Sequence, residues 1–147
     1  MPELPEVETV RRGLHNLIIG KTITSEQHDT DKGFPNVPSD VRQFLIGATI
    51  TDVRRRAKVL LIDLSTDYSL IIHLKMTGQL VFVGELRFGA GHPNDSLVGA
   101  LTDKSTRVTL TFSDSSQLFF NDQRKFGWVK LYPTGLINAL LVGSALE

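Results

Sequence analysis

The sequence contains no cysteine among its 147 residues. It can therefore form no disulfide and no thiolate metal site, which excludes disulfide-stapled scaffolds and cysteine-ligated zinc modules within this chain. No segment approaches the ~20 consecutive apolar residues of a membrane-spanning helix, and the acidic start lacks the apolar run of a signal peptide. We therefore expect one intracellular domain, long enough to bury a core of ordinary size.

Metal-ligand spacing is also absent. The four histidines, His15, His28, His73 and His92, stand far apart in the sequence, so each is expected to be a solvated or a core histidine. We accordingly predict that this chain binds neither a metal ion nor another cofactor.

The chain has no excess charge, because 16 basic residues balance 16 acidic ones. Proteins that neutralise many DNA phosphates usually carry an excess of lysine and arginine, so the sum counts mildly against a strong nucleic-acid binder. The distribution matters more than the sum, since a neutral total can hide a basic face. Basic residues gather at Arg11–Arg12, Arg54–Arg56 with Lys58, and Arg124–Lys125.

Hydrophobic periodicity predicts a strand-rich fold with a helix at its start. Apolar residues recur every three or four positions from Leu4 to Ile18, which predicts an amphipathic helix over residues 5–19 that ends at Gly20. Ser39 is a plausible N-cap for a short helix through Leu45. Strands are expected over residues 22–27, 48–55, 58–64, 69–74, 79–83, 107–112, 118–120 and 127–132, loops over 28–38 and 88–102, and a terminal helix within 133–146.

These elements predict an α+β, strand-dominated fold. We expect a two-layer antiparallel β-sandwich or flattened barrel, flanked by the N-terminal helix and the short second helix.

The start of the chain, Met1-Pro2, suggests a chemical role. An initiator methionine ahead of proline is normally removed, which leaves a secondary amine that titrates at roughly 7.7–8.0 and can form a covalent iminium. By itself the dipeptide fits equally well a proline in a first helical turn. The positive end of the predicted helix disfavours protonation of a nearby amine, so Pro2 stands where its lone pair is more available.

A family resemblance rests on four segments. The opening Pro2–Leu14 resembles the start of bacterial formamidopyrimidine-DNA glycosylase, a family that excises oxidised purines such as 8-oxoguanine and then cuts the abasic strand. Three further segments agree in order and spacing: the basic strand segment Arg55–Leu60, the methionine loop His73–Gly78 and the intercalation loop Asn121–Gly127.

The resemblance implies that residues 1–147 form the N-terminal catalytic domain alone. We expect this isolated domain to bind DNA weakly and to turn over poorly, because the second wall of the DNA-binding cleft is missing. Family members are nearly twice as long, and their helix–two-turn–helix domain and four-cysteine zinc finger have no counterpart in this sequence. Zinc is therefore expected only in the finger of a full-length relative. The implied partner is double-stranded DNA that contains an oxidised base or an abasic site, with no membrane involved, and we expect a monomer.

The resemblance also assigns catalytic roles. Pro2 would attack C1′ of a flipped nucleotide, and Glu3 would protonate the sugar ring oxygen. Glu6 would help to order the active site, although its position fits a carboxylate that stabilises the helix dipole equally well. Lys58 would contact the phosphates and the damaged nucleotide.

Three side chains match the family's gap-filling residues: Met76, Arg124 and Phe126. A thioether and a phenyl ring can fill the hole left by a flipped base, and an arginine can hydrogen-bond the orphaned partner base. Phe126 stands in a polar turn, an unusual place for a core ring. The remaining predicted DNA-binding residues are Arg54, Arg55, Arg56, Lys75 and Lys125, the last of which stands where the family more often has arginine.

Two features depart from the family pattern, and two other functions remain open. Relatives often carry histidine within the segment Asp103–Arg107, so some DNA contacts there are in doubt, and the loop over residues 88–102 is atypical. One alternative is a non-catalytic DNA-binding or interaction domain on the same scaffold. The other is an N-terminal-proline tautomerase, which would share only Pro2.

Overall fold

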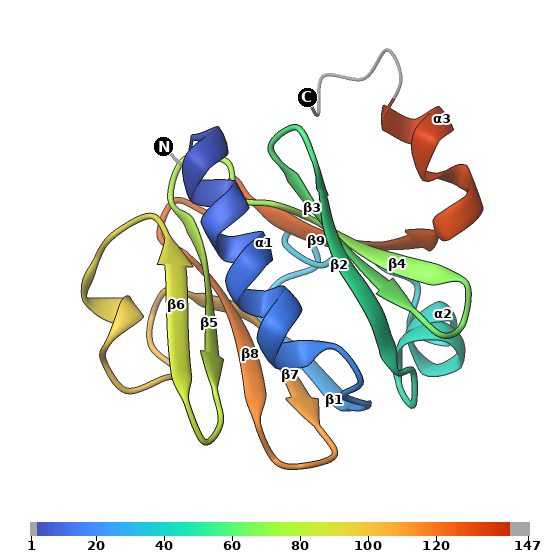
Figure 1. Cartoon of the computed structure of the whole chain (residues 1–147), viewed down its shortest axis with the longest axis horizontal. Coiled ribbons are helices and arrows are strands. Elements are labelled where there is room, and N and C mark those ends of the chain that lie inside the picture. Colours follow the sequence, from blue (N-terminus) through green and yellow to red (C-terminus); the bar gives the residue numbers. More distant parts are fainter. Residues whose placement is uncertain (1–2, 142–147) are drawn as a thin grey trace.

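Two antiparallel β-sheets stacked face to face form the body of the computed structural model, which describes residues 3–141 (Figure 1). The five-stranded sheet has the order β1-β7-β8-β5-β6, and the four-stranded sheet has the order β2-β3-β4-β9. The strands are β1 (Ile23–His28), β2 (Ile50–Arg56), β3 (Val59–Leu64), β4 (Tyr68–His73), β5 (Gly78–Val83), β6 (Arg87–Gly91), β7 (Thr106–Phe112), β8 (Gln117–Asp122) and β9 (Trp128–Pro133). The predicted two-layer, strand-dominated fold is confirmed.

Alternation along the strands builds two apolar clusters. On β3, Leu60 and Ile62 face the other sheet and join the main core, whereas Val59 and Leu61 face outward. The outward side chains are covered by α3 (Ile137–Leu141), which forms a smaller second cluster with them. A strand that is buried on both faces reads as a continuous apolar run, which is how β3 appears in the sequence.

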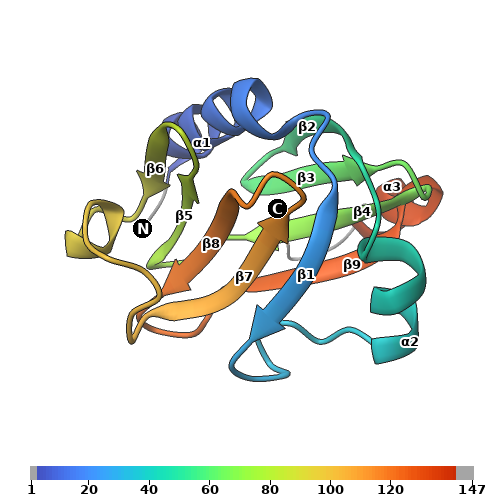
Figure 2. The same ribbon diagram turned by 90° about the horizontal axis from the view of Figure 1, so that it is seen from below.

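Helix α1 (Leu4–Ile18) lies along the open seam between β6 of one sheet and β2 of the other (Figures 1 and 2). It buries Val7, Val10, Leu14 and Ile18, each of which contributes about 1.5–3 kcal/mol when fully buried. The helix predicted over residues 5–19 is confirmed. None of the helices within residues 3–141 is long and apolar enough to pass through a lipid bilayer.

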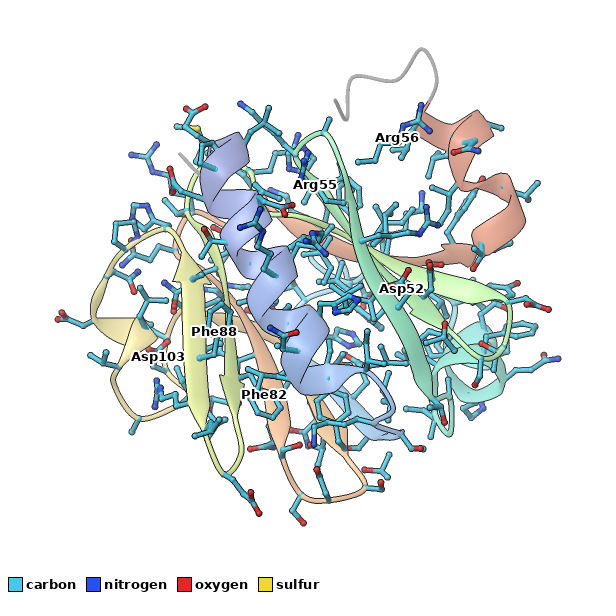
Figure 3. All side chains as sticks on the ribbon, in the orientation of Figure 1. Asp52, Arg55, Arg56, Phe82, Phe88 and Asp103 are labelled. Atoms are coloured by element: carbon cyan, nitrogen blue, oxygen red, sulfur yellow. The ribbon has the colours of Figure 1, made fainter. Side chains whose placement is uncertain are left out.

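A glycine allows α1 to approach β6 closely. A Cβ atom on Gly13 would lie 2.1 Å from Cζ of Phe88, so no other residue fits at this position without moving the ring. Figure 3 labels Phe88 and Phe82, which come from β6 and β5.

The loop predicted over residues 88–102 is wrong, because it contains β6 and a 3₁₀ turn, η2 (Asp95–Leu97). The glycines that argued for a loop permit close packing instead. A Cβ on Gly89 would lie 3.0 Å from Leu97, and a Cβ on Gly91 would lie 2.6 Å from the carbonyl oxygen of Gly78. Pairing with β5 forms an edge strand that local propensity did not reveal.

The helical predictions near residues 39–45 and 133–146 also need correction. The N-cap of α2 (Pro38–Asp40) is Val37 instead of Ser39, because Pro38 occupies the first turn, and a π-helical turn, η1 (Val41–Leu45), follows. At the other position, η3 (Thr134–Leu136) leads into α3, and the rest of the predicted terminal helix lies outside the described residues.

One end of the sandwich brings together the segments that carry the family resemblance. The end of the molecule shown uppermost in Figure 1 holds the start of α1, the β2–β3 turn, the β4–β5 connection and the β8–β9 connection. These are the segments that hold the predicted catalytic and gap-filling side chains.

Candidate active site and DNA-contacting loops

Glu3 and Lys58 meet at the start of α1. Lys58 lies in the β2–β3 turn, with its Nζ 3.5 Å from Glu3 Oε2, and the backbone N–H of Glu3 donates to Glu6 Oε1 at 3.2 Å. The turn is tight, with Ala57 in the left-handed region at φ 51°. Three of the four predicted catalytic residues are therefore together, while Pro2, which precedes Glu3 in the chain, lies outside the described residues.

Glu8 ties α1 to the basic strand β2. Its carboxylate accepts hydrogen bonds from Arg11 Nε and Arg12 Nε, both at 2.9 Å, and from Arg55 Nε at 3.1 Å. Arg55 also donates from Nη1 to the carbonyl of Ala57 at 3.0 Å. These bonds, first from Arg11 and then from Arg55, hold the pKa of Glu8 far below its ordinary value. The network fixes the first turns of α1 against the β2–β3 turn.

We expect the stabilising effect of Glu8 to depend on pH. Because its pKa is lower in the folded protein than its ordinary value of 4.5, the ionised carboxylate stabilises the fold above that pH, and the effect is lost as the pH falls below it. The stability difference between the wild type and Glu8→Gln should therefore be largest near neutral pH and shrink below about pH 4.5. Urea unfolding at a series of pH values measures it. A difference that stays constant with pH would contradict the role given to this network.

The three consecutive arginines of β2 point to different faces. Arg55 faces α1, and Arg56 lies beside α3 (Figure 3). Arg56 donates to Asn138 Oδ1 at 2.8 Å, and Arg54 donates to Asp63 at 2.8 and 3.3 Å on the outer face. Successive side chains of a β-strand point to opposite faces of the sheet, so three neighbouring arginines cannot share one face. Their predicted role as one DNA-binding surface stays a prediction, and the structure gives all three a partner within the chain.

A buried carboxylate joins the methionine loop to the intercalation loop. Asp122, with an exposed fraction of 0%, accepts a hydrogen bond from the Thr77 hydroxyl and another from the Gly127 N–H at 2.6 Å. The Thr77 oxygen in turn accepts the N–H of Arg124 at 3.0 Å. The hydrogen bond between Thr77 and Asp122 thus fixes the two loops side by side, and we call it the staple.

Both loops display apolar side chains to solvent. Phe126 is 50% exposed and Met76 is 36% exposed, although side chains of this kind are usually buried. Sharp turns present them, since Lys75 and Lys125 lie in the left-handed region at φ 52° and 60°. The two loops thus hold both side chains at the surface, where a partner could contact them.

The intercalation loop ends at a glycine that admits no side chain. A Cβ on Gly127 would lie 2.6 Å from the carbonyl oxygen of His73 and 3.0 Å from Asp122 Oδ2. Gly127 therefore packs closely against Asp122 and the end of β4, and Phe126 is the residue before it in the chain. The exposed position of Phe126, expected from its polar neighbours, is confirmed.

A cavity of about 560 Å³ exists among Leu17, Lys21, Phe82 and Asp114, at the end of α1 opposite Glu3.

Residues 3–141 hold no group of three or more histidine, aspartate or glutamate side chains that could bind a metal ion. The sequence contains no cysteine.

Sequence patterns indicate neither the position of Arg107 nor the hydrogen bond between Thr77 and Asp122 that joins the loops. The guanidinium of Arg107 is buried and donates from Nε to the carbonyl of Asp122 at 2.9 Å. The only signal was an aspartate, Asp122, at the start of a polar turn, and such residues are usually solvated. The long separation of Thr77 from Asp122 in the chain hid their pairing.

Comparisons with known proteins agree with this geometry. Residues 1–129 match the family described as the formamidopyrimidine-DNA glycosylase N-terminal domain. The formamidopyrimidine-DNA glycosylase of Shouchella clausii is 43% identical over 141 residues, covering 92% of this chain and 45% of the relative. That of Paracoccus denitrificans is 39% identical over 142 residues, covering 96% and 48%.

Solved structures give the same result. Lactococcus lactis Fpg (MutM) in complex with DNA containing N7-benzyl-Fapy-dG has a TM-score of 0.80 at 31% identity, covering 97% of this chain and 48% of that one. MutM in complex with DNA containing carbocyclic 8-oxo-G has the same TM-score and identity, covering 97% and 49%. The chain spans about half the length of the relatives it matches. From its sequence, its fold and these similarities, the chain belongs to the formamidopyrimidine-DNA glycosylase family.

Proposed function

We propose that this domain acts in base-excision repair of DNA, where it excises oxidised purines such as 8-oxoguanine and formamidopyrimidines and then cuts the abasic strand. The observation that carries the proposal is the meeting of Glu3 and Lys58 at the same end of the molecule as the stapled methionine and intercalation loops. The solved relatives support it, since their structures hold DNA that contains an abasic site, N7-benzyl-Fapy-dG or carbocyclic 8-oxo-G.

Recognition begins with the flipping of the damaged nucleotide, because its glycosidic carbon cannot be reached inside a stacked duplex. Phe126 and Met76 fill the vacated space, which offsets an unstacking cost of about a few kcal/mol. Arg124, which is held next to them through its N–H bond to Thr77, donates to the orphaned base.

The chemistry starts at Pro2. Its nitrogen attacks C1′, the base leaves with the electron pair of the glycosidic bond, and the proton of the nitrogen passes to the Glu3 carboxylate. The Glu3 carboxyl then protonates the ring oxygen, so that the C1′–O4′ bond breaks and a positively charged iminium forms. Loss of a C2′ proton expels the 3′ phosphate, and a second elimination expels the 5′ phosphate.

The surrounding residues hold this chemistry in position. Lys58 binds a phosphate of the flipped nucleotide and keeps the Glu3 carboxylate at the start of α1, 3.5 Å from its ammonium. A partly exposed ion pair of this kind adds only about 0–1 kcal/mol of stability. Glu6 accepts a hydrogen bond from the backbone N–H of Glu3, and this bond orders the same turn. Because the ion pair between Glu3 and Lys58 adds so little stability, its position favours a functional role for the two side chains.

Borohydride trapping tests the proposal. Duplexes that contain 8-oxoguanine or an abasic site should form a stable cross-link with the wild-type chain, because borohydride reduces the iminium to an amine. The cross-link should disappear in Pro2→Gly and persist in the matched surface variant Lys21→Ala, whose side chain lies at the far end of α1. The absence of a cross-link with the wild type, or its persistence in Pro2→Gly, would overturn the proposal.

A non-catalytic DNA-binding domain is the second candidate. The observation that favours it is that the exposed loops with Met76 and Phe126 need no nucleophile to bind DNA. Under this alternative the chain binds damaged duplex but gives no cross-link. The tautomerase alternative leaves both loops without a role and does not follow from the family.

The remaining assignments concern the setting of the reaction. The domain works as the N-terminal catalytic part of the repair enzyme, residues 1–147, with double-stranded damaged DNA as its partner. It acts as a monomer in the bacterial cytoplasm and needs no metal or other cofactor of its own. The organisms of the relatives support the bacterial part of this setting.

A further inference from the structure

Three loops meet at the buried guanidinium of Arg107. Its Nε donates to the carbonyl of Asp122 at 2.9 Å, its Nη1 to the carboxylate of Asp29, and its Nη2 to the carbonyl of Lys104 at 2.7 Å. The backbone closes the arrangement, since the N–H of Asp29 donates to the Arg107 carbonyl at 3.1 Å. The segments over residues 29–36 and 102–106 are therefore fixed against the intercalation loop.

The segment over residues 29–36 is anchored a second time. The carbonyl of Gly33 and the side-chain oxygen of Asn36 each accept a backbone N–H of β9, at 2.8 and 2.7 Å. The anchoring holds Lys32 next to the intercalation loop, with its Nζ 6.0 Å from the centre of the Phe126 ring. Lys32 is exposed, so its ammonium is presented beside the ring.

The segment over residues 102–106 presents a second lysine. The Asp103 carboxylate accepts the Ser105 N–H at 2.9 Å and the hydroxyls of Ser105 and Ser96 at 2.7 and 2.5 Å, which makes the turn rigid. Lys104 follows directly and is exposed. It lines a cavity of about 370 Å³ together with Gln123 at the start of the intercalation loop.

The charges of these loops are distributed unevenly. The carboxylates of Asp29 and Asp103 already accept hydrogen bonds from Arg107 and Ser105. The Asp31 carboxylate lies 3.4 Å from Nε2 of His28. Within residues 3–141, no carboxylate lies within ion-pair distance of Lys32 or Lys104. By contrast, Lys21 and Lys58 at other places in the molecule are both paired with acids.

We infer that Lys32 and Lys104 bind backbone phosphates of the duplex at the two ends of the intercalation loop, Lys32 near Phe126 and Lys104 near Gln123. The inference rests on the proposed function, because it takes the exposed ring as the group that enters the DNA. Arg107 is the positioning residue that keeps both lysines in register with the loop. The footprint on this face thus extends beyond the residues that the family resemblance assigns.

Phosphate contacts have a measurable signature. Each phosphate that a protein neutralises contributes about 0.9 to the slope of log affinity against log salt concentration. Each Lys→Ala change should lower the slope by about 1, and the double variant by about 2. The loss in affinity should be equal on damaged and undamaged duplexes, because phosphate contacts carry no information on the base.

Fluorescence anisotropy at several salt concentrations provides the test, with a duplex that contains a stable tetrahydrofuran abasic analogue and with the undamaged duplex. The variants are Lys32→Ala, Lys104→Ala and their combination. The control is Lys21→Ala, which removes the same charge and also lies over an aromatic ring, 5.6 Å from the centre of Phe82, but at the opposite end of α1. Thermal unfolding of each variant confirms that it is folded.

The expected result is a reduced slope for Lys32→Ala and Lys104→Ala and an unchanged slope for Lys21→Ala. A slope that stays at the wild-type value in both lysine variants, or that falls equally in the control, would overturn the inference. Borohydride cross-linking of the wild type separates the two proposals: a cross-linked wild type with unchanged slopes contradicts only the phosphate contacts, whereas a wild type that neither cross-links nor binds contradicts both.

Discussion

Replacement of Asp122 by alanine is expected to destabilise the domain by about 3 kcal/mol or more, a large share of the free energy of unfolding of a domain of this size. The carboxylate is fully buried and accepts hydrogen bonds from the Thr77 hydroxyl and the Gly127 N–H. Alanine leaves both donors buried without an acceptor, at about 1–3 kcal/mol each. Urea unfolding followed by circular dichroism measures the change.

A matched control exists close by. Asp31, whose side chain is 100% exposed, should change stability by no more than about 0.5 kcal/mol when replaced by alanine. Asp122→Asn should fall between the two, since one oxygen remains as an acceptor. If Asp122→Ala were as mild as Asp31→Ala, the staple between the methionine and intercalation loops would not hold them together.

Replacement of Glu3 by glutamine is expected to slow excision of 8-oxoguanine by about 10²–10⁴-fold, the usual contribution of a general acid. Glutamine keeps the size of the side chain and removes the proton that opens the sugar ring. An abasic site already equilibrates with its open-chain aldehyde, so cleavage at a preformed abasic site should fall much less. Single-turnover rates on the two substrates give the comparison.

Glu85 provides the control for this prediction. It is exposed in the β5–β6 turn, at the end of the molecule opposite Glu3, and its replacement by glutamine removes the same charge. Glu85→Gln should leave both rates unchanged. An equal loss on both substrates in Glu3→Gln would show that Glu3 acts on binding or folding instead of ring opening.

Local patterns predicted the elements that depend on nearest neighbours. The three-and-four spacing from Leu4 to Ile18 gives α1 because its apolar stripe fits the seam between the sheets, and continuous apolar runs give β3 and β4 because both faces of these strands are covered. Strand β6 was missed because Gly89 and Gly91 weaken local propensity, whereas pairing with β5 decides the outcome.

The sequence predicts individual residues of the site but not the contacts between them. The resemblance and the polar turn pointed to Phe126, and its exposure agrees. Contacts between distant segments could not be read, since Thr77 and Asp122 are separated by 45 positions and Lys32 reaches Phe126 only through the fold. Likewise, a run of three arginines reads as one basic surface until strand alternation sends Arg55 to one face and its neighbours to the other.

The identity of the atom that bonds to the sugar tests the account most directly. After borohydride trapping on an abasic duplex, tryptic digestion and mass spectrometry locate the modified residue. The account predicts that the reduced sugar is carried by the N-terminal peptide Pro2–Arg11, on the nitrogen of Pro2. A modified lysine, whether Lys58 beside Glu3 or any other, would contradict it.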